Sequence, residues 1–184
     1  SIERPLVFGN NDTPGVILSS AAKEYLKVYG VLVGKKPLIF TNNDSGYETA
    51  IEFKKNGVDP IILDTRKEPK SEIIDEAKKL DIKIKFSYVV VAAKGYKKVK
   101  SAEVAKISDD KNELGTLETI DCDCICVSGF WTPTIHLASQ SGNKTTFNKD
   151  IDAFVPGLSK QNETTLGAAS GTYTLDETLK SSFD

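Results

Sequence analysis

The sequence predicts an α/β fold: a Rossmann-like parallel sheet in which a β-meander replaces one crossover helix. Between residues 37 and 86, short apolar runs alternate with amphipathic segments in the order strand, helix, strand, helix, strand. That order is typical of a parallel sheet with right-handed crossovers. Residues 87–120 then lose the helical periodicity and form short alternating runs, which indicates a meander or a set of hairpins. The apolar run DCICVSG at 123–129 closes the sheet as a buried strand.

The N-terminal part of the chain is expected to reach the sheet through an extended segment and one helix. Residues 1–18 contain a turn at NNDTPG and no helical pattern. The stretch AAKEYLKVYG at 21–30 has apolar residues at helical spacing. We expect Ser19 or Ser20 to cap the start of this helix and Gly30 to end it.

The alternating region divides into five elements. PLIF at 37–40 is the first strand, and SGYETAIEFKKNG at 45–57 is a helix whose apolar stripe ends at Gly57. DPIILD forms the second strand, SEIIDEAKKL a second helix with a Ser71 cap, and IKIKF the third strand. The meander that follows contains a polar turn, DDKNELG, at 109–115.

The turn after the first strand, TNNDSG at 41–46, is the first candidate nucleotide site. A dinucleotide-binding turn has the pattern G-x-G-x-x-G, with glycines for the tight turn, for close approach of the pyrophosphate and for packing of helix on strand. Only Gly46 keeps its glycine and its packing role, because Thr41 and Asn43 replace the other two. Asp44 adds a carboxylate that satisfies the helix dipole and repels phosphate. We therefore expect a weakened phosphate site.

Asp64 ends the second predicted strand, about 20 residues beyond the turn, where dinucleotide-binding folds place an acid on the adenosine ribose. The competing interpretation is a loop acid that pairs with the nearby Arg66. Both interpretations remain open from the sequence.

After Gly129 the sequence becomes polar and rich in small residues. GAASG at 167–171 is predicted to be a turn at the end of a strand, and TLDETLKSS at 174–182 the first turns of a helix. A strand, a small-residue turn and a helix N-terminus present backbone N–H groups that can bind a phosphate. The sequence therefore offers a second candidate phosphate site.

The composition excludes several classes of function. A chain of 184 residues, 39% hydrophobic and 27% charged, is typical of one globular domain, or of one domain with parts of a neighbour. Its net charge of −2 provides no general basic surface for nucleic acid. No apolar run approaches the roughly 20 residues of a membrane helix, so no membrane partner is expected. The chain starts at Ser1 and lacks methionine, and we interpret it as an excised fragment.

The three cysteines, Cys122, Cys124 and Cys126, lie in one strand-like run. At a period of two their thiols would share one face of the strand. We expect small buried residues rather than a disulfide framework or a zinc site. Free thiols fit a reduced, cytoplasmic compartment. His136, the only histidine, is expected to be structural, and nothing completes a catalytic or redox site.

Five segments carry a resemblance to a known family: ERPLVFGNNDTPGV, FTNNDSGYETA, DCICVSGFWTPTIHLASQSG, AFVPG and GAASGTYTL. In this order, over essentially the whole chain, they resemble the alpha subunit of heterotetrameric sarcosine oxidase. The most specific stretches are NNDxPG and SGxWxPxxHLxSQSG. One departure is Phe130, where glycine is expected, and we expect it to alter the turn before Trp131. The order of elements also resembles the NAD domain of two-dinucleotide flavoproteins.

The resemblance implies a domain organisation, because the family's alpha subunit is much longer than this chain. Residues 34–130 would be a nested nucleotide-binding-type domain. Residues 1–33 would be a connecting segment and helix from an outer dinucleotide domain, and 131–184 the return segment to that domain. The outer domain's own G-x-G-x-x-G would lie upstream.

The resemblance also implies cofactors. In the family the flavin that oxidises the N-methyl amine lies mainly in the beta subunit, FMN lies at the alpha–beta contact, and alpha holds NAD without a clear catalytic role. We therefore expect NAD in the full subunit, and neither FMN nor FAD bound by this fragment alone. Expected dinucleotide contacts come from the return segment and the nested domain: Ala168, Thr172, Tyr173, Leu175, Asn43, Gly46 and Asp64.

The leading hypothesis is a dinucleotide-binding-type piece of a sarcosine oxidase-type amine oxidoreductase. By resemblance, the whole complex with beta, gamma and delta subunits would demethylate sarcosine oxidatively, and the fragment alone would have no turnover. The alternative is a non-enzymatic scaffolding domain with a degenerate nucleotide site. A standalone NAD(P)H-dependent reductase is a third hypothesis, disfavoured by the missing flavin motif and redox cysteines.

Overall fold

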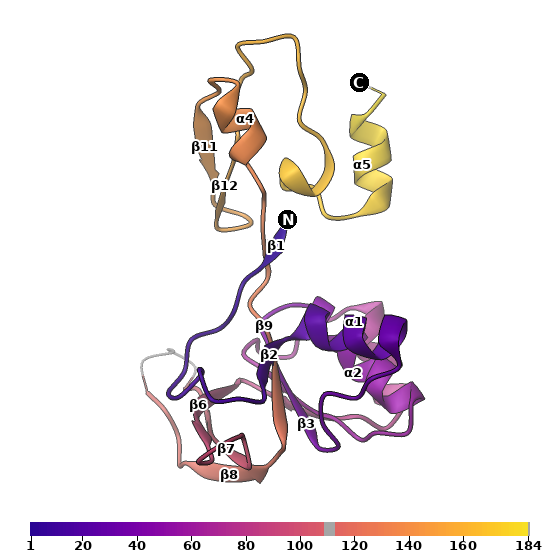
Figure 1. Ribbon diagram of the computed structural model, residues 1–184, viewed down its shortest axis with the longest axis vertical. Helices are drawn as coiled ribbons and strands as arrows, with labels where there is room; N and C mark the ends of the chain where they lie inside the picture. Colours follow the sequence, from indigo (N-terminus) through magenta and orange to yellow (C-terminus); the bar gives the residue numbers. More distant parts are fainter. Residues whose placement is uncertain (109–112, 184) are drawn as a thin grey trace. The chain divides into compact units, whose positions relative to one another are not determined.

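A computed structural model describes residues 1–108 and 113–183; the residues between these ranges, inside the predicted polar turn at 109–115, lie outside the described part. The chain divides into two compact units. The larger is Arg4–Phe130, and the smaller combines Ser1–Glu3 with residues 131–183. Figure 1 shows the helices and strands of both units.

In the described part of the chain, the larger unit is built on a five-stranded sheet with the order β2-β9-β3-β4-β5. All neighbouring strands in this sheet run parallel. β9 comes last in the sequence and yet lies inside the sheet, between β2 and β3. The strands are β2 (Val16–Leu18), β3 (Pro37–Thr41), β4 (Ile61–Asp64), β5 (Lys83–Phe86) and β9 (Cys124–Ser128).

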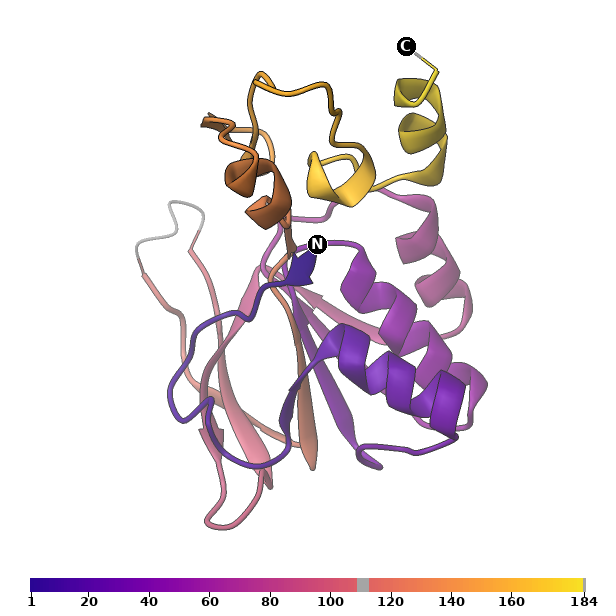
Figure 2. The same cartoon turned by 45° about the horizontal axis from the view of Figure 1, so that its top comes forward.

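Two different layers cover the faces of this sheet (Figure 2). The helices on one face are α1 (Ser19–Tyr29), α2 (Ser45–Lys55) and α3 (Glu72–Lys79). The other face carries an antiparallel meander of β6 (Tyr88–Lys94), β7 (Ser101–Lys106) and β8 (Glu118–Asp121). The prediction of a Rossmann-like parallel sheet with a β-meander crossover is therefore confirmed.

The central strands are apolar throughout because both of their faces are covered. In β3, Ile39 packs into the core cluster on the helix side, whereas Leu38 and Phe40 pack into the cluster on the meander side. All residues of β3 are buried. A continuous apolar run thus becomes a strand with two different packing partners.

The cysteines are free and buried, as predicted, but they do not share one face. Cys124 and Cys126 belong to the helix-side cluster, and Cys122 belongs to the meander-side cluster. The reason is a break before β9. There the Asp123 carboxylate accepts hydrogen bonds from the backbone N–H groups of Lys35 (2.8 Å) and Lys36 (2.7 Å). The prediction of a single face was wrong because it assumed an unbroken strand.

The Cys122 thiol should make the stability of the larger unit fall at alkaline pH. Burial, with smaller effects of Cys124 and the neighbouring acids, raises the pKa of Cys122 to about 12. An unfolded thiol titrates near pH 8.5, so above that pH the unfolded chain loses a proton that the folded chain keeps. The free energy of unfolding should therefore fall across this window, by up to about 1.4 kcal/mol per pH unit.

This slope can be measured by urea unfolding between about pH 9 and pH 11, above the reference pKa of cysteine. Cys122→Ala leaves a small cavity that lowers stability at every pH, but it should flatten the slope. Equal slopes in the wild type and the variant would contradict the prediction.

The N-terminal part of the chain contributes one strand and one helix to the larger unit. β2 pairs with β9, and α1 follows it directly, so both elements belong to the larger unit. The N-cap residue is Leu18, which makes no side-chain capping bond, and Ser19 lies inside the helix. The predicted serine cap is therefore wrong, whereas Gly30 ends the helix in the left-handed conformation as expected. The assignment of 1–33 to an outer domain stays a prediction.

Phe130 stands where the family resemblance leads us to expect glycine. Its backbone is left-handed, with φ of 76°, a conformation that glycine adopts without strain. The Arg4 guanidinium lies 5.9 Å from the centre of the Phe130 ring, and Arg4 N donates to Phe130 O at 2.8 Å. The turn thus keeps a glycine-like backbone despite the side chain.

The smaller unit contains short elements in the described part of the chain. Its strands are β1 (Ile2–Glu3) with β10 (Trp131–Thr132), and the hairpin β11 (Thr145–Asn148) with β12 (Ala153–Pro156). Its helical elements are α4 (His136–Gln140), the 3-10 turn η1 (Gly167–Ala169) and α5 (Leu175–Ser181). α5 matches the predicted helix start. The predicted strand before GAASG is absent from the described residues, because β12 ends at Pro156 and η1 follows an irregular segment.

None of the helices in the described residues is long and apolar enough to cross a membrane.

Candidate functional site

The candidate site lies at the carboxyl ends of β3, β4 and β9. Thr41 at the end of β3 is in register with Asp64 of β4 and Ser128 of β9. The chain leaves β3 toward β4 on one side and returns through β9 on the other, so β3 and β9 flank the point where the strand order reverses. In open α/β sheets, ligands bind outside the strand ends at this point.

Gly46 lets helix α2 pack closely on β3. A Cβ atom at this position would lie 2.7 Å from both Cβ and Oγ1 of Thr41, closer than real side chains approach. Thr41 Oγ1 in turn donates to Asn43 O (2.8 Å) and accepts from Asn43 N (3.1 Å). The third glycine of the nucleotide pattern therefore keeps its packing role, while Thr41 holds the turn in a fixed shape.

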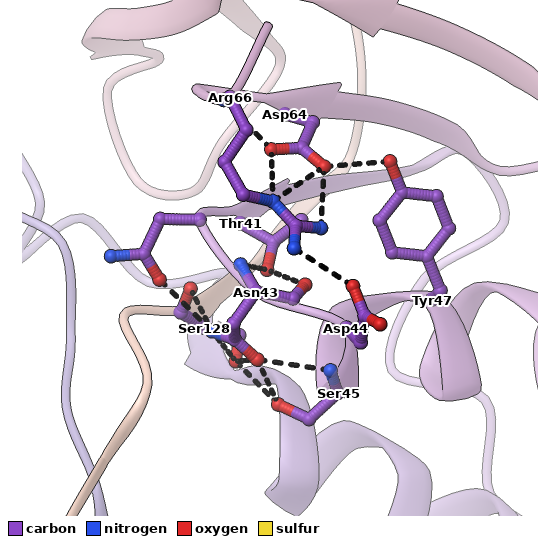
Figure 3. A network of polar contacts seen from close by, with 9 residues as sticks. Thr41, Asn43, Asp44, Ser45, Tyr47, Asp64, Arg66 and Ser128 are labelled. Atoms are coloured by element: carbon purple, nitrogen blue, oxygen red, sulfur yellow. Dashed lines mark hydrogen bonds and ion pairs between the residues drawn. The ribbon is translucent and has the colours of Figure 1, made fainter. Parts of the chain in front are cut away.

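The Asn43 side chain stands at the position of the second glycine, where the pyrophosphate would approach the backbone closely. It is 6% exposed, and its Oδ1 accepts from the backbone N of Ser45 at 2.9 Å, the first residue of α2 (Figure 3). Its Nδ2 donates to the carbonyl and hydroxyl oxygens of Ser128, both at 3.1 Å. A backbone N–H at the start of a helix is what binds phosphate in such turns. Here the amide oxygen of Asn43 accepts the hydrogen bond from that N–H group.

The Asp64 carboxylate is fully buried and saturated with donors. Oδ1 accepts from Arg66 N (2.9 Å) and Nε (3.0 Å), and Oδ2 accepts from the Tyr47 hydroxyl (2.7 Å) and Arg66 Nη2 (2.8 Å). A carboxylate offers about four acceptor sites, so none remains for a ribose hydroxyl. The pairing of Asp64 with Arg66, one of the two interpretations from the sequence, is present in the structure.

Arg66 bridges two acids across the site (Figure 3). Besides its bonds to Asp64, its Nη1 lies 2.8 Å from Asp44 Oδ1. Burial alone would lower the pKa of Arg66, but hydrogen bonds to Asp64 and Asp44 and their charges outweigh it and raise the pKa. Burial, reinforced by the bond to Asp64, raises the pKa of Tyr47.

The polar groups of this turn are engaged with one another. Asn43 Oδ1 accepts from the Ser45 N–H at the start of α2, and the guanidinium of Arg66 is held by two carboxylates. Two acids and one guanidinium leave the cluster negatively charged, which disfavours an anion. The arrangement can hold the strand ends together, and it is poorly suited to a dinucleotide pyrophosphate.

The structure divides the predicted contact residues between the two units. Asn43 and Asp64 lie at the site just described (Figure 3), and Gly46 packs against Thr41 beside them. The others lie in the smaller unit, on and after η1: Ala168, Thr172, Tyr173 and Leu175.

The turn that carries this second set is internally bonded. Thr172 N donates to Gly167 O (3.1 Å), and the Tyr173 hydroxyl donates to Trp131 O (2.8 Å). Ala168 is half-buried and Leu175 is 75% exposed. Leu175 and Ala168 can therefore meet a further group, while the Tyr173 hydroxyl already has a partner.

His136 is exposed rather than packed in a core. It lines a cavity of about 540 Å³, within the size range of ligand pockets, together with Glu163 and Leu166. No group of three or more metal-ligating side chains is found in the described residues. His136 begins the short helix α4, and its expected structural role stays a prediction.

Sequence reasoning missed the contributions of Tyr47 and Ser128. It named Asp44 as an acid of the turn but missed its ion pair with Arg66. Tyr47 belongs to the apolar stripe of α2, and its buried ring gave no hint of its hydroxyl partner. A buried tyrosine needs such a partner. The acid at the end of the neighbouring strand was the available signal.

No protein-family model matches the chain. Sarcosine oxidase alpha subunits do match: that of Rhizobium meliloti (strain 1021) is 38% identical over 178 residues, 92% of this chain. That of Corynebacterium sp. (strain P-1) is 32% identical over 173 residues, 93% of this chain. The matches span only 16% and 18% of those proteins' own lengths. The predicted resemblance is confirmed.

Solved structures support the fold. The Lactococcus lactis thioredoxin reductase aligns with a TM-score of 0.68 at 14% identity, covering 94% of this chain and 56% of the reductase. The L-proline dehydrogenase from P. horikoshii aligns with a TM-score of 0.56 at 20% identity, covering 91% of this chain and 28% of that protein. At such identities the likeness concerns the fold alone.

Proposed function

We propose that the chain is a segment of the alpha subunit of a multisubunit, sarcosine oxidase-type amine oxidoreductase. The observation that carries the proposal is the 38% identity to a sarcosine oxidase alpha subunit over 92% of this chain. The whole complex oxidatively demethylates sarcosine or a related N-methyl amine. The segment by itself has no turnover.

The full subunit holds NAD, and the return segment contributes contacts from Ala168, Thr172, Tyr173 and Leu175. The exposed side chain of Leu175 and the small residues of η1 support this assignment, because they leave room for a ligand beside the turn. FMN and FAD are bound elsewhere in the complex. Its beta, gamma and delta subunits are the partners, and the complex is cytoplasmic.

A scaffolding role for the larger unit is favoured by one specific observation. Asn43 and Arg66 occupy the positions from which a dinucleotide-binding turn contacts its ligand. In this proposal the larger unit keeps the architecture of a nucleotide domain but binds no nucleotide. It acts as a scaffold that positions other parts of the subunit.

A titration of the 184-residue chain with NAD and with ADP-ribose tests this assignment. We expect no change in melting temperature. A Kd of about 100 μM would stabilise the chain by about 2.7 kcal/mol at a hundredfold excess, which thermal unfolding detects readily. If a shift appears, Asn43→Asp locates it. This variant keeps the oxygen that accepts from Ser45 N but adds a negative charge. If the variant no longer shows the change in melting temperature, the nucleotide binds in the larger unit and the scaffold proposal is wrong.

The parent activity needs its own test, with the complete subunit co-expressed with its partner subunits. Sarcosine-dependent release of formaldehyde is the expected result. In that complex, Leu175→Asp should weaken NAD retention, whereas Asn43→Asp should leave it unchanged. A complex that retains NAD but oxidises no N-methyl amine would overturn the activity while leaving the cofactor assignment standing.

A further inference from the structure

Six exposed lysines lie in segments beside the amino-terminal ends of β3 and β9, at the edge of the parallel sheet opposite the candidate site. Two of them lie in the loop before β3, and four lie between the end of β6 and the start of β7. Both segments adjoin the break before β9: Asp123 N donates to Lys36 O (3.2 Å), and Cys122 N donates to Lys100 O (3.3 Å). We call this group the lysine edge; its members are Lys35, Lys36, Lys94, Lys97, Lys98 and Lys100.

The backbone that carries these lysines is held in place. The Asp123 carboxylate fixes the loop by accepting from the N–H groups of Lys35 and Lys36. In the hairpin, Val99 is fully buried, its N–H donates to Pro14 O (2.9 Å), and Lys100 N donates to Lys94 O (2.8 Å). The lysine side chains are therefore presented from a fixed platform.

Most of the lysine edge lacks compensating carboxylates. Lys94 pairs with Glu103 at 3.0 Å, but the other five lysines form no salt bridge within the described residues. The helices of the same unit differ: each lysine of α1 and α2 has a carboxylate partner. The acids beside the lysine edge are Asp121 and Asp123, and the Asp123 carboxylate is already engaged with backbone N–H groups.

An exposed aromatic side chain stands among these charges. Tyr96, at the tip of the hairpin, is 93% exposed. Tyrosine is enriched at the centres of protein–protein interfaces, because it combines a large contact area with a hydrogen-bonding hydroxyl. A tyrosine in a segment with several exposed lysines is suited to a partner that offers carboxylates around an apolar contact.

We propose that the lysine edge docks an acidic surface of another segment of the alpha subunit, an inference that rests on the proposed function. Charge complementarity supports this occupant, since opposite charges steer association and fix register. The matched relatives also place most of their polypeptide outside the region aligned here. A nucleic acid is a poorer fit because the patch contains no arginine, and Asp121 and Asp123 interrupt it where a phosphate backbone would continue.

The test is binding of a fluorescent oligoglutamate peptide to the full chain, followed by anisotropy at low ionic strength, where surface charges are weakly screened. Lys97→Glu combined with Lys98→Glu should weaken binding about tenfold. The matched control is Lys67→Glu combined with Lys70→Glu, which makes the same change in net charge at exposed lysines after β4, at the opposite edge of the sheet. The control should change the affinity by less than about twofold, because distant surface charges are screened.

Tyr96→Ser distinguishes the contribution of the aromatic contact from that of the lysine charges, since it leaves every lysine in place. With a glutamate peptide that contains one leucine, this variant should lose affinity while the salt dependence stays the same. Equal losses in the two double variants, or no binding by the wild type, would overturn the proposal. Tighter binding of oligothymidylate than of oligoglutamate would overturn it in favour of a nucleic-acid surface.

Discussion

Replacing Arg66 with methionine is expected to lower the free energy of unfolding of the larger unit by about 3–5 kcal/mol. The change leaves the carboxylate of Asp64, which is fully buried, without its charge partner and without two of its four donors, Nε and Nη2 of Arg66. The backbone N–H of residue 66 and the Tyr47 hydroxyl remain as donors. Breaking a buried pair from one side costs far more than the intact pair contributes.

Urea unfolding of the chain measures this loss. Lys54→Met is the matched control, because it removes an ion pair with Asp59, whose side chain is 85% exposed. We expect the control to cost less than about 1 kcal/mol. Adding Asp64→Asn to Arg66→Met removes the unpaired charge, so the double variant should be more stable than the sum of the single losses implies. Additive losses would show that the two side chains do not depend on one another.

Gly46→Val should destabilise the larger unit by about 3 kcal/mol, at the upper end of overpacking costs. The new Cβ would meet Thr41 at 2.7 Å, and Thr41 is fixed by two hydrogen bonds to the Asn43 backbone. Either helix α2 moves away from β3 or the turn distorts. The same urea titration reports the change.

Two further variants separate the clash from other effects of valine. Glu48→Val puts a β-branched residue on the exposed side of the same helix and should cost less than about 1 kcal/mol. Gly46→Ala combined with Thr41→Gly exchanges the large and the small partner and should recover part of the stability lost in Gly46→Ala alone. No recovery would mean that Thr41 is not the obstacle.

The architecture was predictable because several local signals agreed. The apolar runs of β3, β4 and β9, the amphipathic α2 and α3, and the loss of helical period after residue 87 all indicate the same α/β order. The break before β9 was not predictable from periodicity, because it depends on hydrogen bonds from a loop almost ninety positions away to Asp123. The assignment of β2 and α1 likewise depends on long-range pairing with β9.

The site was predictable in outline but not in its details. Thr41, Asn43 and Gly46 stand at fixed positions of a known turn pattern, so their departures from glycine could be judged one by one. Whether Asp64 faced a ribose or a guanidinium depended on where the Arg66 side chain points, which spacing does not determine. The role of Tyr47 could not be predicted for a similar reason, since a buried tyrosine can pack its ring in an apolar core and also donate a hydrogen bond from its hydroxyl.

The position of β9 has a consequence for synthesis of the protein. β2 leaves the ribosome more than a hundred residues before β9, its neighbour in the described sheet. The edge of β3 that faces β9 also stays unpaired until β9 has been synthesised. Pairing of such distant segments is slow, because a long loop must close before any contact forms. Until Ser128 has emerged, β2 has no partner strand and β3, which pairs with β4, keeps one open edge, so the nascent chain is prone to aggregation or to chaperone binding.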